Sequence, residues 1–133
     1  MERAMLIDLT RRFTDAFNRN DLDAVMAFFA DDGVYDEFNG KRNRGKNAIR
    51  AAFEPQLTGT FGKMEFLEDD IFVDSATGSA MISWRCTLSI KGQPTSWRGL
   101  DLLRFVGGRV VSKRTYAKTR VPLFEEDWRA ARE

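Results

Sequence analysis

The sequence contains no histidine and only one cysteine, Cys86, among its 133 residues. Without histidine the chain can form neither a Ser-His-Asp nor a Cys-His nucleophile, and it offers no imidazole ligand to zinc or iron. A single cysteine excludes an internal disulfide and a thiolate zinc site. Any chemistry must therefore depend on carboxylates, hydroxyls, amines and an apolar pocket, and we expect neither a metal nor a cofactor.

The chain also lacks an excess of charge of one sign and any long apolar run. Lys plus Arg number 21 and Asp plus Glu number 20, which gives a net charge of +1, whereas dedicated nucleic-acid binders carry a clear basic excess. No apolar run approaches the roughly 18 residues of a membrane span, and the N-terminus is too charged for a signal peptide. We therefore expect a cytoplasmic protein, folded as one domain over residues 1–133, that binds neither nucleic acid nor membrane.

The first part of the sequence has the periodicity of helices. Apolar residues over 6–17 recur at steps of three or four, which predicts a helix with one apolar face. Asp21 is the predicted N-cap of a second helix over residues 22–29. Residues 34–38 are predicted to form a short strand, and a third short helix is expected to stop before Pro55.

After residue 60 the period switches to two. Strands are predicted over residues 63–73, 78–90, 95–106 and 109–119. Gly107-Gly108 indicates a hairpin turn, and residues 123–133 are predicted to form a last short helix. Helices followed by antiparallel strands predict an α+β fold, with the helices packed on one face of a curved sheet. A strongly bent sheet leaves a cone-shaped interior, which is a usual place for a small ligand.

Four motifs carry a resemblance to a known family. They are D-L-D before the second helix, F-A-D-D before the first strand, R-G-x-x-A-I-R at 44–50 and L-D-x-x-R-F at 100–105. In this order they make nearly the whole chain similar to the nuclear transport factor 2-like superfamily, and more closely to its SnoaL-like and ketosteroid-isomerase-like branch. The resemblance implies a cone-shaped α+β barrel with a mainly antiparallel sheet, and a homodimer.

The resemblance also implies a function. It points to a cofactor-free isomerase or cyclase that acts by carboxylate acid/base chemistry on an apolar carbonyl substrate, steroid-like or polyketide-like. The alternative is a non-catalytic module of the same fold that binds a small apolar ligand or a protein partner. Limonene epoxide hydrolases share the fold, but their two water-activating aspartates would fall on Thr87 and Thr115, so this activity is set aside.

The resemblance places the isomerase base on Glu37 and the acid that hydrogen-bonds the enolate on Asp101. A register slip of one residue would put Asp36 in the place of Glu37. The second enolate donor of the family, a tyrosine, corresponds to Phe13, which cannot donate a hydrogen bond. Tyr116 on the last predicted strand is a candidate to replace it.

Asp101 has support that is independent of the resemblance. Period two places it on one strand face with the apolar side chains of Trp97, Leu103 and Phe105. Such surroundings should raise the pKa of Asp101 and keep it neutral, so that it can donate a hydrogen bond. Asp101→Asn should then be neutral or stabilising near pH 7. The alternative is a structural aspartate paired with Arg85, Arg104 or a hydroxyl group.

The remaining predictions concern the pocket wall and the surface. The expected pocket-lining residues are Phe13, Phe17, Phe53, Trp97, Leu103, Phe105 and Tyr116. Cys86 alternates with apolar neighbours, which predicts a buried and inert thiol. The basic stretches 41–50 and 109–120 are expected to be solvated surfaces, with binding of an anionic group as the alternative.

Overall fold

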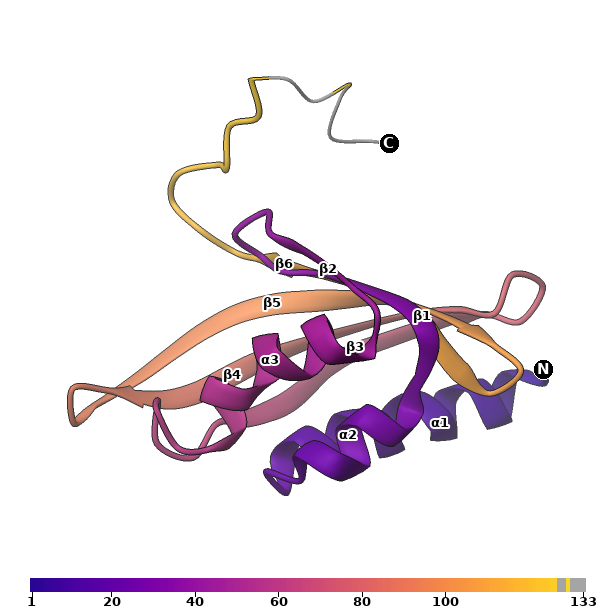
Figure 1. Ribbon diagram of the computed structural model, residues 1–133, viewed down its shortest axis with the longest axis horizontal. Coiled ribbons are helices and arrows are strands. Elements are labelled where there is room, and N and C mark those ends of the chain that lie inside the picture. The colour runs from indigo at the N-terminus through magenta and orange to yellow at the C-terminus, as the bar shows by residue number, and fades with distance from the viewer. Residues whose placement is uncertain (127–128, 130–133) are drawn as a thin grey trace.

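Three helices pack against a curled six-stranded sheet in the computed structural model, which describes residues 1–126 and 129 (Figure 1). The helices are α1 (Arg3–Asn18), α2 (Leu22–Phe28) and α3 (Lys46–Leu57). The strands are β1 (Phe29–Asp36), β2 (Arg42–Arg44), β3 (Glu65–Asp74), β4 (Ser79–Ile90), β5 (Gln93–Val106) and β6 (Arg109–Ala117). The predicted α+β class is confirmed.

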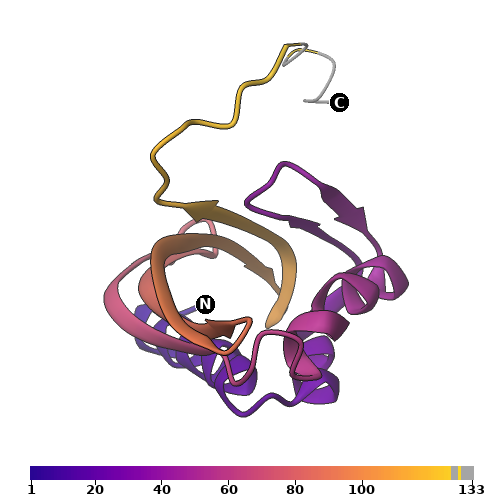
Figure 2. The same ribbon diagram turned by 90° about the vertical axis from the view of Figure 1, so that its left-hand side faces the viewer.

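The strand order in the sheet is β2-β1-β6-β5-β4-β3. Each neighbouring pair is antiparallel except β1 and β6, which run parallel. The sheet curls into an incomplete ring, and the helices cover its open side (Figure 2). This curvature creates a concave face on which side chains from β1, β4, β5 and β6 meet.

The predicted apolar face of the first helix forms the centre of the core. The residues that α1 buries are Leu6, Leu9, Thr10, Phe13, Ala16 and Phe17. The ring of Phe13 packs edge-on against those of Phe17, Phe28 and Phe29, with centroid distances of 5.1 to 5.5 Å. Asp21 caps α2 as predicted, because its side chain accepts a hydrogen bond from the Ala24 backbone N–H at 3.0 Å.

Two glycine positions allow the strands to turn and bend. Gly107 and Gly108 have φ angles of 58° and 79°, which a tight hairpin turn between β5 and β6 requires. At Gly99, a Cβ atom would lie 2.4 Å from the Tyr116 carbonyl oxygen and 2.8 Å from the Trp84 ring. The absence of a side chain at Gly99 therefore lets β5 pass closely over Trp84.

The structure departs most from the predicted elements at β1, β2 and α3. β1 begins at Phe29 instead of residue 34, because Phe29 already pairs with Val110 of β6. The three-residue strand β2 was not predicted, since its sequence is wholly polar. α3 does not stop before Pro55 but continues to Leu57, whose burial offsets the one helical hydrogen bond that a proline removes.

Residues 118–126 extend away from the sheet after β6 (Figures 1 and 2). The helix predicted over 123–133 is absent from residues 123–126, and the rest of that prediction lies outside the described residues, apart from 129. No helix in the described part of the chain has the length and apolar character needed to cross a bilayer.

Candidate functional site

A cavity of about 570 Å³ lies between the concave face of the sheet and the helices. Nine of its 21 lining residues are aromatic: Phe13, Phe17, Tyr35, Phe38, Phe53, Phe61, Phe66, Trp84 and Trp97. Its charged lining residues are Glu37, Asp101 and Lys113. This volume and composition are typical of a small-molecule site, in which a few polar groups orient an otherwise apolar ligand.

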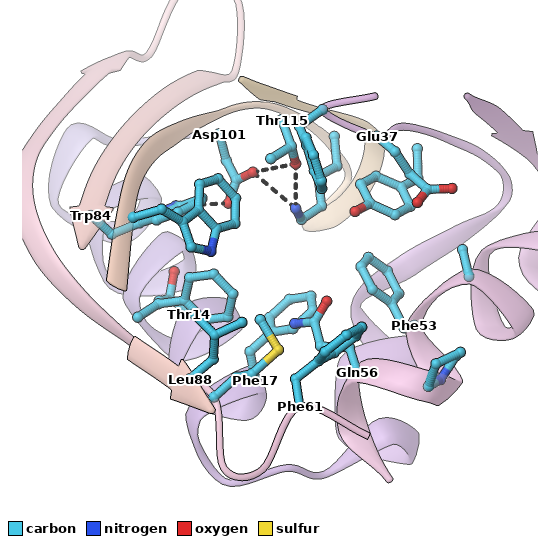
Figure 3. Close-up of a pocket in the computed structure, with 18 of the residues that line it drawn as sticks. Thr14, Phe17, Glu37, Phe53, Gln56, Phe61, Trp84, Leu88, Asp101 and Thr115 are labelled. Carbon is cyan, nitrogen blue, oxygen red and sulfur yellow. Dashed lines mark hydrogen bonds and ion pairs between the residues drawn. The ribbon is translucent and has the colours of Figure 1, made fainter. Parts of the chain in front are cut away.

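Asp101 lies at the centre of a hydrogen-bond network in the cavity wall (Figure 3). Its Oδ1 atom accepts hydrogen bonds from Lys113 Nζ at 2.9 Å and from the Thr115 hydroxyl at 2.6 Å. Its Oδ2 atom accepts a hydrogen bond from the Trp84 indole N–H at 3.2 Å. Lys113 Nζ also donates to Thr115 Oγ1 at 2.8 Å, which closes a triangle of polar atoms.

The pairing of β5 with β6 determines this geometry. Asp101 lies directly opposite Thr115, and Lys113 lies two residues before Thr115 on the same strand. Because side chains alternate along a strand, all three point to the concave face. The register of β5 with β6 thus brings a carboxylate, an ammonium group and a hydroxyl group together.

The contacts of Asp101 are those of the second interpretation, a structural aspartate with polar partners. Its carboxylate accepts from three donors, one of which is the Lys113 ammonium group. Asp101 is thus a paired carboxylate, as the alternative allowed. Its partners are Lys113 and Thr115 rather than Arg85 or Arg104.

Lys113 was not predicted as a site residue. It belongs to the basic stretch 109–120, which was expected to be solvated, yet Lys113 is only 5% exposed. Its Nζ atom lies 4.7 Å from the ring centroid of Tyr35 and about 5.5 Å from those of Phe17 and Phe53. These rings and Asp101 together compensate the buried ammonium charge.

Tyr35 supplies the phenol group that Phe13 lacks. It lines the cavity, is buried, and stacks on Phe53 with a centroid distance of 4.4 Å. Burial, with the negative charges of Asp101 and Glu37, raises the pKa of Tyr35 well above its usual range. The phenol therefore stays protonated and keeps its O–H group, which also interacts with Thr115. The sequence could have indicated this position, because strand alternation places Tyr35 on the same face as Glu37 and opposite to Asp36.

Glu37 lines the cavity just after the end of β1. Its Oε2 atom accepts a hydrogen bond from the Asn43 side-chain amide at 3.0 Å, and this amide also donates to the Tyr35 carbonyl oxygen. Asp36, the alternative position, forms a two-pronged ion pair with Arg42 and does not line the cavity. Of Asp36 and Glu37, it is thus Glu37 whose carboxylate faces the cavity.

The other predicted lining residues divide into two groups. The cavity is lined by Phe13, Phe17, Phe53 and Trp97, as expected. Leu103 and Phe105 are instead buried in the main hydrophobic core, because the strand carries them past the end of the cavity. Tyr116 is 50% exposed and does not line the cavity, since it alternates with the inward-facing Thr115. The expected lining is therefore corrected at these three positions.

The prediction for Cys86 is confirmed. Its side chain is fully buried, and burial raises the pKa of the thiol to about 12. A thiol in this state is a poor nucleophile near neutral pH. Among the described residues, no group of three acidic or cysteine side chains is arranged to hold a metal ion.

The comparisons with known proteins agree on the fold. The model of the SnoaL-like domain family matches residues 10–113. A solved nuclear transport factor 2-like protein of unknown function from Mesorhizobium loti is 26% identical, with a TM-score of 0.75 over 90% of this chain and 96% of that chain. A proposed polyketide cyclase from Xanthomonas campestris is 21% identical, with a TM-score of 0.74 over 87% of this chain and 92% of that chain.

A third solved structure contains a ligand. It is a protein with a ketosteroid isomerase-like fold from Catenulispora acidiphila in complex with trimethylamine, 20% identical, with a TM-score of 0.71 over 81% of this chain and 83% of that chain. No curated protein matches the sequence. At these identities the likeness establishes the cone-shaped α+β fold.

Proposed function

The chain belongs to the SnoaL-like domain family, and on this basis we propose that its cavity binds a small apolar carbonyl compound and moves a proton on it by acid/base chemistry, without a cofactor. One observation carries the proposal: the carboxylate of Glu37, the phenol of Tyr35 and the Asp101–Lys113 pair line one cavity together with nine or more aromatic or aliphatic side chains. A carbonyl ligand matches this wall, because its body is apolar and its oxygen requires donors.

Glu37 is the proposed base. Asn43 holds one carboxylate oxygen, and the other has no hydrogen-bond partner among the described residues. A carboxylate held in this way can take a proton from the carbon next to the carbonyl group. The electron pair then moves to the carbonyl oxygen and forms an enolate.

Lys113 and Tyr35 are the proposed donors to the enolate oxygen. Both bear N–H or O–H groups on the cavity wall, and both lie in surroundings from which water is largely excluded. Asp101 is then a positioning residue, because it holds the Lys113 ammonium group in place. Return of the proton to another carbon gives an isomerase, whereas attack of the enolate on a second carbonyl group gives a cyclase of the kind proposed for the Xanthomonas protein.

Deuterium exchange tests the proposal without knowledge of the natural substrate. β-Tetralone, an apolar ketone with acidic C–H groups, is incubated with the protein in D₂O and followed by proton NMR. We expect exchange faster than in buffer, and a loss of about 100-fold or more in Glu37→Gln. Glu68→Gln, which removes a surface carboxylate outside the cavity, is the matched control and should exchange like the wild type. Buffer-level exchange by the wild type would contradict the proposal.

A second candidate is a binding module without catalysis. The replacement of the isomerase tyrosine by Phe13, which is buried in the core, favours it. Trp84 and Trp97 line the cavity and report ligand binding by fluorescence. Binding of β-tetralone without exchange would support this second candidate.

We also propose that two copies pair through the outer face of the sheet. Phe72 is 64% exposed there, and a shallow groove beside it is lined by Met81, Leu102 and Arg114. An apolar surface of this kind is costly in a monomer. A second copy is the proposed occupant, because β3 and β5 present apolar side chains on both of their faces.

A further inference from the structure

The fold does not require a buried ion pair at the positions of Lys113 and Asp101. Both residues are under a tenth exposed, and a buried ion pair is often no more stabilising than apolar side chains of similar volume. Leu103 and Phe105, which follow Asp101 on the same strand face, show that apolar residues pack well in this part of the sheet. The pair therefore calls for a chemical explanation.

The surroundings of Lys113 are those of a reactive amine. Its Nζ atom lies on the cavity wall between the rings of Tyr35, Phe17 and Phe53, where water has little access. Asp101 Oδ1 at 2.9 Å is close enough to accept a proton from the ammonium group, and Thr115 Oγ1 at 2.8 Å is close enough to relay one. Desolvation in an apolar pocket is one means by which proteins turn lysine into a nucleophile, and Asp101 gives the ammonium proton a place to go when a carbonyl group approaches.

We propose that Lys113 forms a protonated imine with an aldehyde or ketone bound in the cavity. The proposal rests on the proposed function to the extent that both require a carbonyl ligand. It goes beyond that function, because the carbonyl carbon becomes covalently attached to the protein.

The step balances with the groups present. Lys113 passes one proton to Asp101, and the neutral Nζ attacks the carbonyl carbon, so that a C–N bond forms and the C=O π bond breaks. A second proton moves from nitrogen to the former carbonyl oxygen and gives a carbinolamine. Asp101 then returns its proton to this hydroxyl group, which leaves as water as the C=N bond forms. One carbonyl compound and one ammonium group give one iminium ion and one water molecule.

The iminium ion fits the site that the ammonium group occupied. It keeps the single positive charge beside Asp101 and the rings of Tyr35 and Phe53. It also withdraws electrons from the neighbouring C–H bond more strongly than the carbonyl group does. Glu37 would then remove a proton from a more acidic carbon, so the imine makes the proposed proton transfer easier.

Reductive trapping tests this inference. The full-length protein is incubated with 2-naphthaldehyde and sodium cyanoborohydride, and the modified lysine is located by peptide mass spectrometry. 2-Naphthaldehyde has no C–H next to its carbonyl group, so trapping does not depend on proton removal by Glu37. We expect Lys113 to gain the mass of the aldehyde less one oxygen atom, at a rate at least about 10-fold above that of the exposed Lys63.

Three variants separate the possible outcomes. Lys113→Arg keeps the positive charge but cannot form an imine, and should lose the label, whereas Lys63→Arg should keep labelling at Lys113. Glu37→Gln should also keep the label, which distinguishes this inference from the proposed function. Labelling of the exposed lysines with Lys113 unmodified in the wild type would overturn the inference, even if β-tetralone exchange is observed. This readout uses the wild type and does not depend on the folding of a variant.

Discussion

Lys113 Nζ lies 2.9 Å from Asp101 Oδ1, across the pairing of β5 with β6 and on the wall of the cavity. Both side chains are almost wholly removed from water. The two charges therefore depend on each other, since a lone ion in this place would lack its main compensation.

Asp101→Asn should be strongly destabilising near pH 7, by about 3–5 kcal/mol, because it leaves the buried ammonium group of Lys113 without its counter-charge. This reverses the expectation from sequence, which assumed a neutral acid. Urea unfolding followed by tryptophan fluorescence measures the change. The double variant Asp101→Asn with Lys113→Met removes both charges and should recover part of the loss. A single variant as stable as the wild type would show that the pair contributes nothing to the fold.

Glu37→Gln should change the free energy of unfolding by less than about 1 kcal/mol. Glu37 is only half-buried, and a glutamine oxygen can still accept the hydrogen bond from Asn43. The same variant is expected to lose β-tetralone exchange, so stability and activity should separate. Urea unfolding of both proteins in one buffer provides the comparison. A large loss of stability would make Glu37 a structural residue.

Tyr35 should resist ionisation in the folded protein. Its pKa is raised above the usual value of 10 by burial and by the charges of Asp101 and Glu37. As the pH rises, the phenol of Tyr35 ionises in the unfolded chain before it ionises in the folded protein. The free energy of unfolding therefore keeps the full contribution of Tyr35 below pH 10 and falls as the pH rises above 10. In Tyr116→Phe, Tyr35 is the remaining tyrosine, and tyrosinate absorbance should stay low past pH 10 until unfolding. Ionisation at pH 10 without unfolding would contradict the burial of Tyr35.

Phe105→Ala should lower the free energy of unfolding by about 3–5 kcal/mol, because it leaves a hole in the core. Lys41→Ala, at an exposed position, should change it by less than about 0.5 kcal/mol. Thermal or urea unfolding of the two variants checks this contrast. Equal effects would mean that the two positions do not differ in burial.

Light scattering at micromolar concentration should report a dimer of the 15.2 kDa chain. Phe72→Glu should convert it to a monomer, since the charge would be placed in the proposed contact. Met5→Glu, also at an exposed apolar position but on α1, is the matched control and should stay dimeric. A wild-type particle of monomer mass would rule out the pairing.

Except for β2, the helices and strands were predictable because their apolar residues recur with a helical or strand period. The face of α1 and the alternation along β4 both appear directly in the sequence. The start of β1 was not predictable, because it depends on pairing with β6, a strand some 80 residues further along the chain. Local sequence carries no trace of such a contact.

The site was predictable in part. Glu37 and Asp101 could be placed in the cavity from the resemblance and from strand alternation. The ion pair of Asp101 with Lys113 could not be predicted, because the position of Lys113 follows from the register of β5 with β6. In the sequence Lys113 is one of several basic residues, and only the register distinguishes it from its exposed neighbour Arg114.

The place of β6 between β1 and β5 has a consequence for synthesis on the ribosome. β1 is made early, yet its long partner is the last strand, so β1 can pair only with the short β2 while residues 37–108 are added. A nascent chain that ends before Arg109 holds two separate groups of strands, β2–β1 and β5–β4–β3, with no strand to join them into one sheet. Contacts so distant in sequence form slowly, and an unpaired strand edge is open to wrong partners until they form. Since Lys113 and Thr115 lie on β6, the cavity acquires these two polar groups in the same event that closes the sheet.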